Sequence, residues 1–349
     1  MARKIPVAVL GATGAVGQQL VALLEGHPWF ELSEVAASER SAGRLYGEVV
    51  DWRLEGSPPE AAGRLRVQPP EQAPRSRLLL SALDAAVAAE AERRLARAGY
   101  AVVSNSSSHR MDADVPLVVP EVNALHLRAL AASRTPAGGF IVTNPNCSTT
   151  GLVVALKPLW DRFGIAEVQV TTLQAISGAG LDGVSGGAIT DNVIPFISGE
   201  EEKLECEPLK ILGTWEGRFV PAELVLSATC HRVPVLHGHL ESVSVRLKSS
   251  AGLDDVRQAL AGFRAEPDVA GLPSSPAIPI RVHAAPDRPQ PRLDRGEGAG
   301  MTVTVGRVRP CPVLGWKFNV LSHNLIRGAA GAALLNAELL VARGELGSD

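Results

Sequence analysis

The stretch Ile5-Pro6-Val7-Ala8-Val9-Leu10-Gly11-Ala12-Thr13-Gly14-Ala15-Val16-Gly17 decides the fold of this chain. Residues 5–10 are typical of a buried strand, and residues 18–24 continue with helical spacing. Between them, glycines would let a dinucleotide approach the backbone, and the helix N-terminus would face its pyrophosphate. The alternative is a glycine turn that only packs a helix on a strand. The candidate cofactor contacts here are Gly11, Thr13, Gly14, Ala15, Val16 and Gly17.

The pattern of strands and helices continues along the first ~145 residues, as expected for a doubly wound parallel sheet. Its remaining expected strands are residues 32–37, 77–82, 100–104, 115–119 and 140–143. Further on, strands with alternating apolar and polar residues indicate a mixed sheet with one solvated face. These are residues 168–173, 241–248 and 301–307. The proline-rich residues 266–295 are expected to form an ordered surface loop.

Composition excludes several classes of protein. The 349 residues carry 34 Lys and Arg against 37 Asp and Glu, a net charge of −3, so nucleic acid is not an expected partner. No apolar run approaches the ~18 residues of a membrane span, and residues 1–5 lack a signal-peptide pattern. Four widely spaced cysteines suggest reduced thiols in the cytoplasm and no metal-ligand cluster.

A second decisive stretch is Thr143-Asn144-Pro145-Asn146-Cys147-Ser148-Thr149-Thr150-Gly151. It predicts a strand, a tight turn at Asn-Pro-Asn and a helix that begins at Cys147. The N–H groups of a helix N-terminus would lower the pKa of the thiol and could hold an oxyanion. Cys147 is therefore a candidate nucleophile. The alternative is a buried structural cysteine.

Cofactor preference depends on the turn after the second strand. Arg40 between Ser38 and Ser41 is typical of a site for the 2′-phosphate of NADP. Glu39 is the counter-evidence, since a carboxylate at this place binds the ribose hydroxyl of NAD.

Other candidate site residues lie beyond Cys147. A base for the thiol could be His231, His237 or His239, and spacing does not choose among them. Gln174 precedes a glycine turn at residues 177–180 that could approach a cofactor. The run 200–203 reads from spacing alone as a solvated helix face.

Taken together, these motifs resemble the aspartate-β-semialdehyde dehydrogenase family over nearly the whole chain. The resemblance is closest to its archaeal and fungal branch, because the segment between Gly180 and Val193 is short. The matching motifs are the glycine loop 11–17, residues 38–44, the stretches 104–112 and 115–123, Asn144-Pro145-Asn146-Cys147, Gln174 to Gly180, and Arg232 to His239.

The resemblance implies that L-4-aspartyl phosphate is reduced with NADPH to L-aspartate 4-semialdehyde and phosphate. It implies that Cys147 forms a thioester, that His239 is the general acid/base and that Gln174 orients the acyl group. It assigns phosphate to Arg110 and Lys203, and the substrate's carboxylate and ammonium to Arg232 and Glu200, with Glu201 a near alternative. The remaining implied contacts are Asn146 for the substrate, and Ser177, Gly178 and Asn324 for the cofactor.

The resemblance also implies an architecture and leaves rivals. We expect a Rossmann-like NADP-binding domain at 1–146, completed by a C-terminal helix at 324–349. Residues 147–323 would form an α+β catalytic and dimerisation domain, in a homodimer or homotetramer. The rivals are N-acetylglutamyl-phosphate reductase, a malonyl-CoA or succinyl-CoA reductase, and an inactive NADP-binding homologue.

Overall fold

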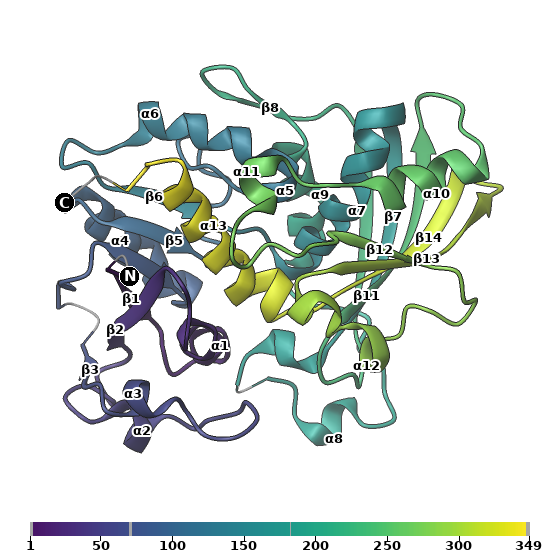
Figure 1. The fold of residues 1–349 in the computed structure, drawn as a ribbon. Helices are drawn as coiled ribbons and strands as arrows, with labels where there is room; N and C mark the ends of the chain where they lie inside the picture. Colours follow the sequence, from purple (N-terminus) through teal and green to yellow (C-terminus); the bar gives the residue numbers. More distant parts are fainter. Residues whose placement is uncertain (1–2, 70–71, 182, 347–349) are drawn as a thin grey trace.

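The first sheet lies on the left in Figure 1 and is parallel throughout. The computed structural model describes residues 3–69, 72–181 and 183–346. The strand order is β3 (Val67–Gln68), β2 (Phe30–Ala36), β1 (Ile5–Leu10), β4 (Leu78–Ser81), β5 (Ala101–Ser104), β6 (Phe140–Thr143). The order reverses after β1, which is the arrangement of a dinucleotide-binding sheet. The expected doubly wound fold is confirmed.

Two details of this sheet differ from expectation. Residues 115–119 form no strand and contribute a single bridge, Leu117 to Thr143. The two-residue β3 was not predicted, because so short a strand has no periodicity to detect. The helices of this half are α1 (Ala15–Leu24), α2 (Tyr46–Val49), α3 (Glu60–Gly63), α4 (Ala85–Arg97), α5 (Pro120–Asn123), η1 (Ala124–Ala129) and α6 (Leu130–Ser133).

The second sheet is mixed, as expected. Its order is β10 (Val225–Arg232), β7 (Ile165–Gln174), β11 (His239–Leu247), β14 (Gly315–Ser322), β13 (Val303–Cys311), β12 (Ile280–His283). Burial alternates along β10, β7 and β11, so one face is covered and the other is largely exposed. Helices α7 (Cys147–Phe163), α9 (Glu200–Ile211) and α10 (Leu253–Gly262) pack with strands of this sheet.

Shorter elements complete the second half. The expectation of a loop over residues 266–295 was wrong, because β12 lies within it and pairs with β13. The strand itself contains no proline, since Pro279 precedes it and Pro286 follows it. The remaining elements are η2 (Ile176–Ala179), α8 (Gly186–Ile189), β8 (Thr214–Trp215), β9 (Phe219–Val220), α11 (Pro267–Ala270), α12 (Pro291–Asp294) and η3 (Glu297–Gly300).

The C-terminal segment runs back to the first sheet, as the yellow helix in Figure 1 shows. It begins with a π-helix, η4 (Ile326–Ala330), and continues as α13 (Gly331–Ala342). Leu334 and Leu335 of α13 share a core with strand residues Val9 and Val142. No helix in the described part of the chain is long and apolar enough to cross a membrane.

Candidate active site

Cys147 lies at the N-terminus of α7, where the strand, turn and helix form as expected. The side chain of Asn146 caps this helix, and its Oδ1 accepts the N–H groups of Ser148 and Thr149 at 2.9 and 3.4 Å. The cap satisfies two of the N–H groups that a helix start leaves unpaired. The capped first turn of α7 therefore fixes the position of Cys147, the candidate nucleophile.

The imidazole of His239 faces the thiol. Its Nε2 lies 3.1 Å from Sγ of Cys147. The structure thus singles out His239 from the three histidines that spacing left open. Of the other two, His237 has Nδ1 2.9 Å from Ser177 Oγ, and His231 Nδ1 has no hydrogen-bond partner among the described residues.

Both groups of this pair are neutral in the free protein. Burial raises the pKa of the Cys147 thiol to about 12, and the charge of Glu200 adds to this effect. Part of the residue remains exposed, but the surrounding protein atoms desolvate its sulfur. Burial also lowers the pKa of His239 to about 3, with a further contribution from Arg232. The expectation that the helix N-terminus would give a lowered thiol pKa is wrong for this state, because desolvation outweighs the helix dipole.

Glu200 is the centre of a buried polar cluster. Its Oε1 accepts from Lys203 Nζ at 2.9 Å, and its Oε2 accepts from Asn146 Nδ2 at 2.8 Å and Gln174 Nε2 at 3.3 Å. Burial alone would raise the pKa of Glu200, but Lys203 and these hydrogen bonds outweigh it and the pKa is lowered. Glu201 instead accepts the backbone N–H of Cys230. Glu200 is therefore the carboxylate beside Cys147.

Two arginines approach the cluster from different elements. Arg232 ends β10 and donates from Nη1 to the Ala175 carbonyl at 2.7 Å. Arg110 donates from Nη2 to the Asn105 carbonyl at 2.8 Å, and its Nε has no partner among the described residues. Each arginine therefore keeps N–H groups that could meet an anion.

Glu207 is a site residue that the sequence analysis missed. Its Oε1 accepts from Arg110 Nη1 at 2.9 Å, and its Oε2 accepts the backbone N–H of Asn146 at 2.6 Å. Glu200, Lys203 and Glu207 lie three and four residues apart, on one face of α9. A charged residue seven positions after Glu200, beside buried Leu204 and Ile211, was the signal that could have found it.

The glycine loop has the features needed for a pyrophosphate. The N-terminus of α1 has no side-chain cap and no acidic residue in its first turn, so its N–H groups are free to bind an anion. Gly11 has φ 75°, and a Cβ there would lie 2.5 Å from the Ala82 carbonyl oxygen, so only glycine fits. The N–H groups of Gly11 and Ala12 both bond the Ala36 carbonyl.

These bonds hold the glycine loop against the end of β2, from which the turn of Ser38, Arg40 and Ser41 continues. Ser38 and Arg40 are exposed there. Their positions are compatible with a group attached to the ribose of a dinucleotide whose pyrophosphate lies at α1.

Ser177 and Asn324 are hydrogen-bonded to each other, and Gly178 lies against the ring of His239. Asn324 donates from Nδ2 to Ser177 Oγ at 2.9 Å, and its Oδ1 accepts the Gly238 N–H at 2.9 Å. A Cβ on Gly178 would lie 3.1 Å from Cε1 of His239. The absence of a side chain at Gly178 therefore lets this turn lie close to His239 and its neighbour Cys147.

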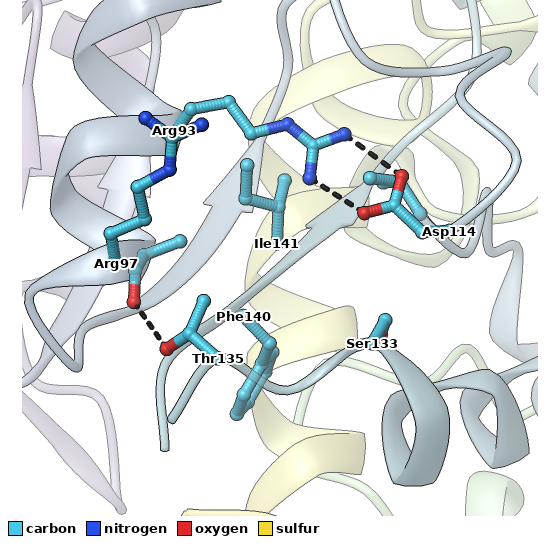
Figure 2. Close-up of a pocket in the computed structure, with 9 residues that line it drawn as sticks. Arg93, Arg97, Asp114, Ser133, Thr135, Phe140 and Ile141 are labelled. Carbon is cyan, nitrogen blue, oxygen red and sulfur yellow. Dashed lines mark hydrogen bonds and ion pairs between the residues drawn. The ribbon is translucent and has the colours of Figure 1, made fainter. Parts of the chain in front are cut away.

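Figure 2 shows a pocket whose lining residues do not include Cys147 or His239. This cavity of about 260 Å³ lies at the start of β6, beside Phe140 and Ile141, whereas Cys147 follows the opposite end of that strand. Arg93 pairs with Asp114 at its edge. Ligands of such sheets bind at the carboxyl ends of the strands, so this pocket is not the candidate active site.

Comparisons with known proteins agree with this geometry. The family described as "Semialdehyde dehydrogenase, NAD binding domain" matches residues 6–130, and "Semialdehyde dehydrogenase, dimerisation domain" matches residues 156–327. The aspartate-semialdehyde dehydrogenase of Archaeoglobus fulgidus is 49% identical over 96% of this chain and 97% of its own length. That of Candida albicans is 46% identical, with coverage of 96% and 97%.

Solved structures give the same result. The crystal structure of the Candida albicans enzyme with NADP has a TM-score of 0.91 and 44% identity, covering 99% of this chain and all of the other. An aspartate semialdehyde dehydrogenase II from Vibrio cholerae, complexed with ASA, has a TM-score of 0.79 and 30% identity. It covers 97% of this chain and 99% of its own.

Proposed function

Because this chain belongs to the aspartate-semialdehyde dehydrogenase family, we propose that it reduces L-4-aspartyl phosphate to L-aspartate 4-semialdehyde with NADPH and releases phosphate. The observation that carries this proposal is the Cys147–His239 pair, 3.1 Å apart, beside the cluster around Glu200. A thiol at a helix N-terminus next to an imidazole suits acyl transfer through a thioester. The family places the reaction in the synthesis of lysine, threonine and methionine from aspartate.

NADP fits the residues of the first sheet. The uncapped N-terminus of α1 would hold the pyrophosphate, and Arg40 with Ser38 and Ser41 would hold the 2′-phosphate. NADPH supplies the hydride. Ser177, Gly178 and Asn324 would border the nicotinamide, next to His239.

Different charged side chains would bind the two ends of the substrate. The substrate's carboxylate would meet Arg232, whose planar guanidinium can donate two parallel hydrogen bonds. Its ammonium would meet Glu200, whose lowered pKa keeps it ionised. Its phosphate would meet Arg110 and Lys203.

Cys147 would attack the acyl carbon between these two ends. Gln174 and Asn146, both hydrogen-bonded to Glu200, would hold the acyl group in line with the thiol. His239 Nε2 lies close enough to contact the carbonyl oxygen once the carbon–sulfur bond forms.

The second sheet belongs to a dimerisation domain, and we propose that its exposed face is covered by a second copy. That face presents Val225, Ser227 and Thr229 of β10, and Leu173 of β7. A homodimer is the smallest assembly that covers it, and a homotetramer is the alternative. The four cysteines are free thiols, which is consistent with the cytoplasm.

The decisive experiment is NADP reduction in the phosphate-dependent oxidative direction. Aspartate semialdehyde with phosphate should give turnover. Replacing phosphate by CoA, or the substrate by N-acetylglutamate semialdehyde, should abolish it. Turnover with CoA would identify an acyl-CoA reductase instead, and turnover with the N-acetylated substrate would identify the other acyl-phosphate reductase.

A further inference from the structure

Arg110 is held at its guanidinium by two hydrogen bonds. Nη1 donates to Oε1 of Glu207 on α9 at 2.9 Å, and Nη2 donates to the Asn105 carbonyl at 2.8 Å. The buried Nε has no partner among the described residues, so its N–H is available to an anion. The direction in which this N–H points depends on the backbone from which the side chain starts.

The backbone at Arg110 is held from the same helix by Lys210, which lies one turn after Glu207. The ammonium of Lys210 donates to the carbonyl oxygens of Arg110, Asp112 and Val115, each at 2.8 Å. An ammonium has three N–H groups, so these bonds use all of them. Lys210 is only 5% exposed, and water therefore competes little for the three carbonyls.

The segment that Lys210 contacts, residues 107–115, makes only long backbone hydrogen bonds within itself. The N–H groups of Arg110, Asp112 and Val115 donate inside this turn over 3.4, 3.2 and 3.3 Å. The bonds from Lys210 are shorter, and a charged donor makes a hydrogen bond about twice as strong as a neutral one. Arg93 of α4 also holds the turn, but through the side chain of Asp112. Lys210 therefore makes the shortest bonds to the backbone of the turn.

We propose that Lys210 is a positioning residue for the candidate phosphate site, because its ammonium fixes the backbone from which the Arg110 guanidinium reaches the phosphate. Lys210 does not bind the phosphate itself, since backbone carbonyls occupy its N–H groups. A displacement of about 1 Å in a binding group can lower a rate on the order of a hundredfold. This inference rests on the proposed phosphate-dependent function and adds a residue to that site.

The ammonium of Lys210 is enclosed by several elements. The titratable and aromatic groups that face it are Asp112 and Asp114 of the turn, His126 on η1 and Phe219 on β9. The two carboxylates favour its charge. The ring of Phe219 lies 4.4 Å from Nζ, within the range of a cation–π contact, and His126 packs against that ring.

This enclosure makes the contact sensitive to alkaline pH. Burial lowers the pKa of Lys210 to about 8, although the carboxylates of Asp112 and Asp114 act in the opposite direction. Above this pH the side chain becomes an amine with two N–H groups and no charge, which binds carbonyl oxygens more weakly. The turn then loses part of its support, whereas Arg110 keeps its own charge.

The first test separates two KM values in the phosphate-dependent oxidative direction. Lys210→Met keeps the length of the side chain and removes its donors. We expect the KM for inorganic phosphate to rise about tenfold or more and the KM for the semialdehyde to change less than about twofold. The matched control is Lys248→Met, where an exposed lysine donates to one carbonyl, and it should change neither value. A folded Lys210→Met protein with an unchanged KM for phosphate, or with equal rises in both KM values, would overturn the proposal.

The second test uses the wild-type protein and does not depend on a variant that folds. The KM for phosphate should rise above about pH 8, the pKa of Lys210, with the semialdehyde and NADP saturating. Lys210→Arg, whose guanidinium does not titrate, should flatten this rise. A KM for phosphate that stays constant in the wild type, or a rise that persists in a folded Lys210→Arg protein, would overturn the proposal.

Amide hydrogen exchange distinguishes this inference from the proposed function. Exchange in a peptide covering residues 104–116, measured without substrate, should be faster in Lys210→Met than in the wild type. Equal exchange would mean that Lys210 does not hold the turn, whatever substrate the enzyme uses. If the wild type fails to turn over with phosphate, the proposed function is refuted instead.

Discussion

The guanidinium of Arg110 and the carboxylate of Glu207 form a buried ion pair, with Nη1 and Oε1 2.9 Å apart. The same carboxylate accepts the backbone N–H of Asn146, the residue before the candidate nucleophile Cys147. One side chain thus connects the candidate phosphate site to the turn that positions the thiol. Its removal should affect both stability and phosphate binding.

Glu207→Ala leaves the Arg110 charge buried without its partner. Breaking such a pair costs about 3–5 kcal/mol in the free energy of unfolding, measured by urea denaturation. Glu202→Ala, at an exposed position of the same helix, should change it by less than about 0.5 kcal/mol. Equal losses in the two variants would show that the ion pair does not stabilise this site.

Cys147→Ser should abolish turnover and leave the fold intact, because a hydroxyl is a far weaker nucleophile than a thiolate. Circular dichroism and NADP binding should match the wild type. Cys206→Ser and Cys311→Ser are the controls and should retain most activity. A Cys147→Ser enzyme with normal rates would exclude the covalent mechanism.

Arg40→Ala should weaken NADPH selectively, because the lost guanidinium contacts only the 2′-phosphate in our assignment. The measurement is the ratio of kcat/KM for NADPH to that for NADH, which should fall. Arg97→Ala, on α4, should leave the ratio unchanged. If the wild type already uses NADH equally well, Glu39 sets the preference and the Arg40 assignment fails.

Arg110→Ala and Arg232→Ala should separate the two ends of the substrate. Each substitution should lower kcat/KM roughly tens- to thousands-fold, which corresponds to a loss of about 2–5 kcal/mol of transition-state stabilisation. In the oxidative direction Arg110→Ala should raise the KM for phosphate more than that for the semialdehyde, and Arg232→Ala should do the reverse. Arg232→Lys should restore little, because an ammonium cannot make a planar two-pronged contact. Proportional increases in both KM values for both variants would refute separate subsites.

Acid should destabilise the protein through its buried neutral histidines. Burial lowers the pKa of His239 to about 3 and that of His323 to about 4, against an ordinary value of 6.5. Below about pH 6.5 these histidines bind protons in the unfolded chain but stay neutral in the folded chain. The free energy of unfolding therefore decreases as the pH falls.

The expected slope is at most about 1.4 kcal/mol per pH unit for each of these groups. Urea denaturation across mildly acidic pH should therefore show a shallower decline for His323→Gln than for the wild type. Parallel declines would mean that His323 is charged in the folded protein.

The sequence predicted the elements whose local signals are strong. The glycine turn after Val9 and Leu10 predicted a strand–turn–helix unit of a parallel sheet. The turn ending at Asn146 predicted that a helix begins at Cys147. Both predictions were possible because turns and helix caps depend on residues close together in the sequence. The role of His239 came from a resemblance, since spacing alone offered three histidines.

What the sequence did not predict depends on contacts between distant segments. Glu207 contacts Arg110, which is 97 residues away in the sequence. The pKa of Cys147 depends mainly on how far other elements of the fold exclude water from its sulfur. A single backbone N–H, that of Ala175, orients His239 across 64 residues. Every residue except proline has a backbone N–H, so no sequence motif identifies the one that contacts His239.

The π-helix that follows β14 places Gly328 directly against Cys147, where a Cβ would lie 2.6 Å from the Cβ of the nucleophile. Beyond it, Asn336 of α13 donates to Asn144 in the turn before that cysteine. The surroundings of the thiol are thus completed by η4 and α13, which follow the strands of both sheets in chain order. The candidate site can therefore form only after residues 326–342 have packed against the turn before Cys147, so it depends on contacts between segments far apart in the chain.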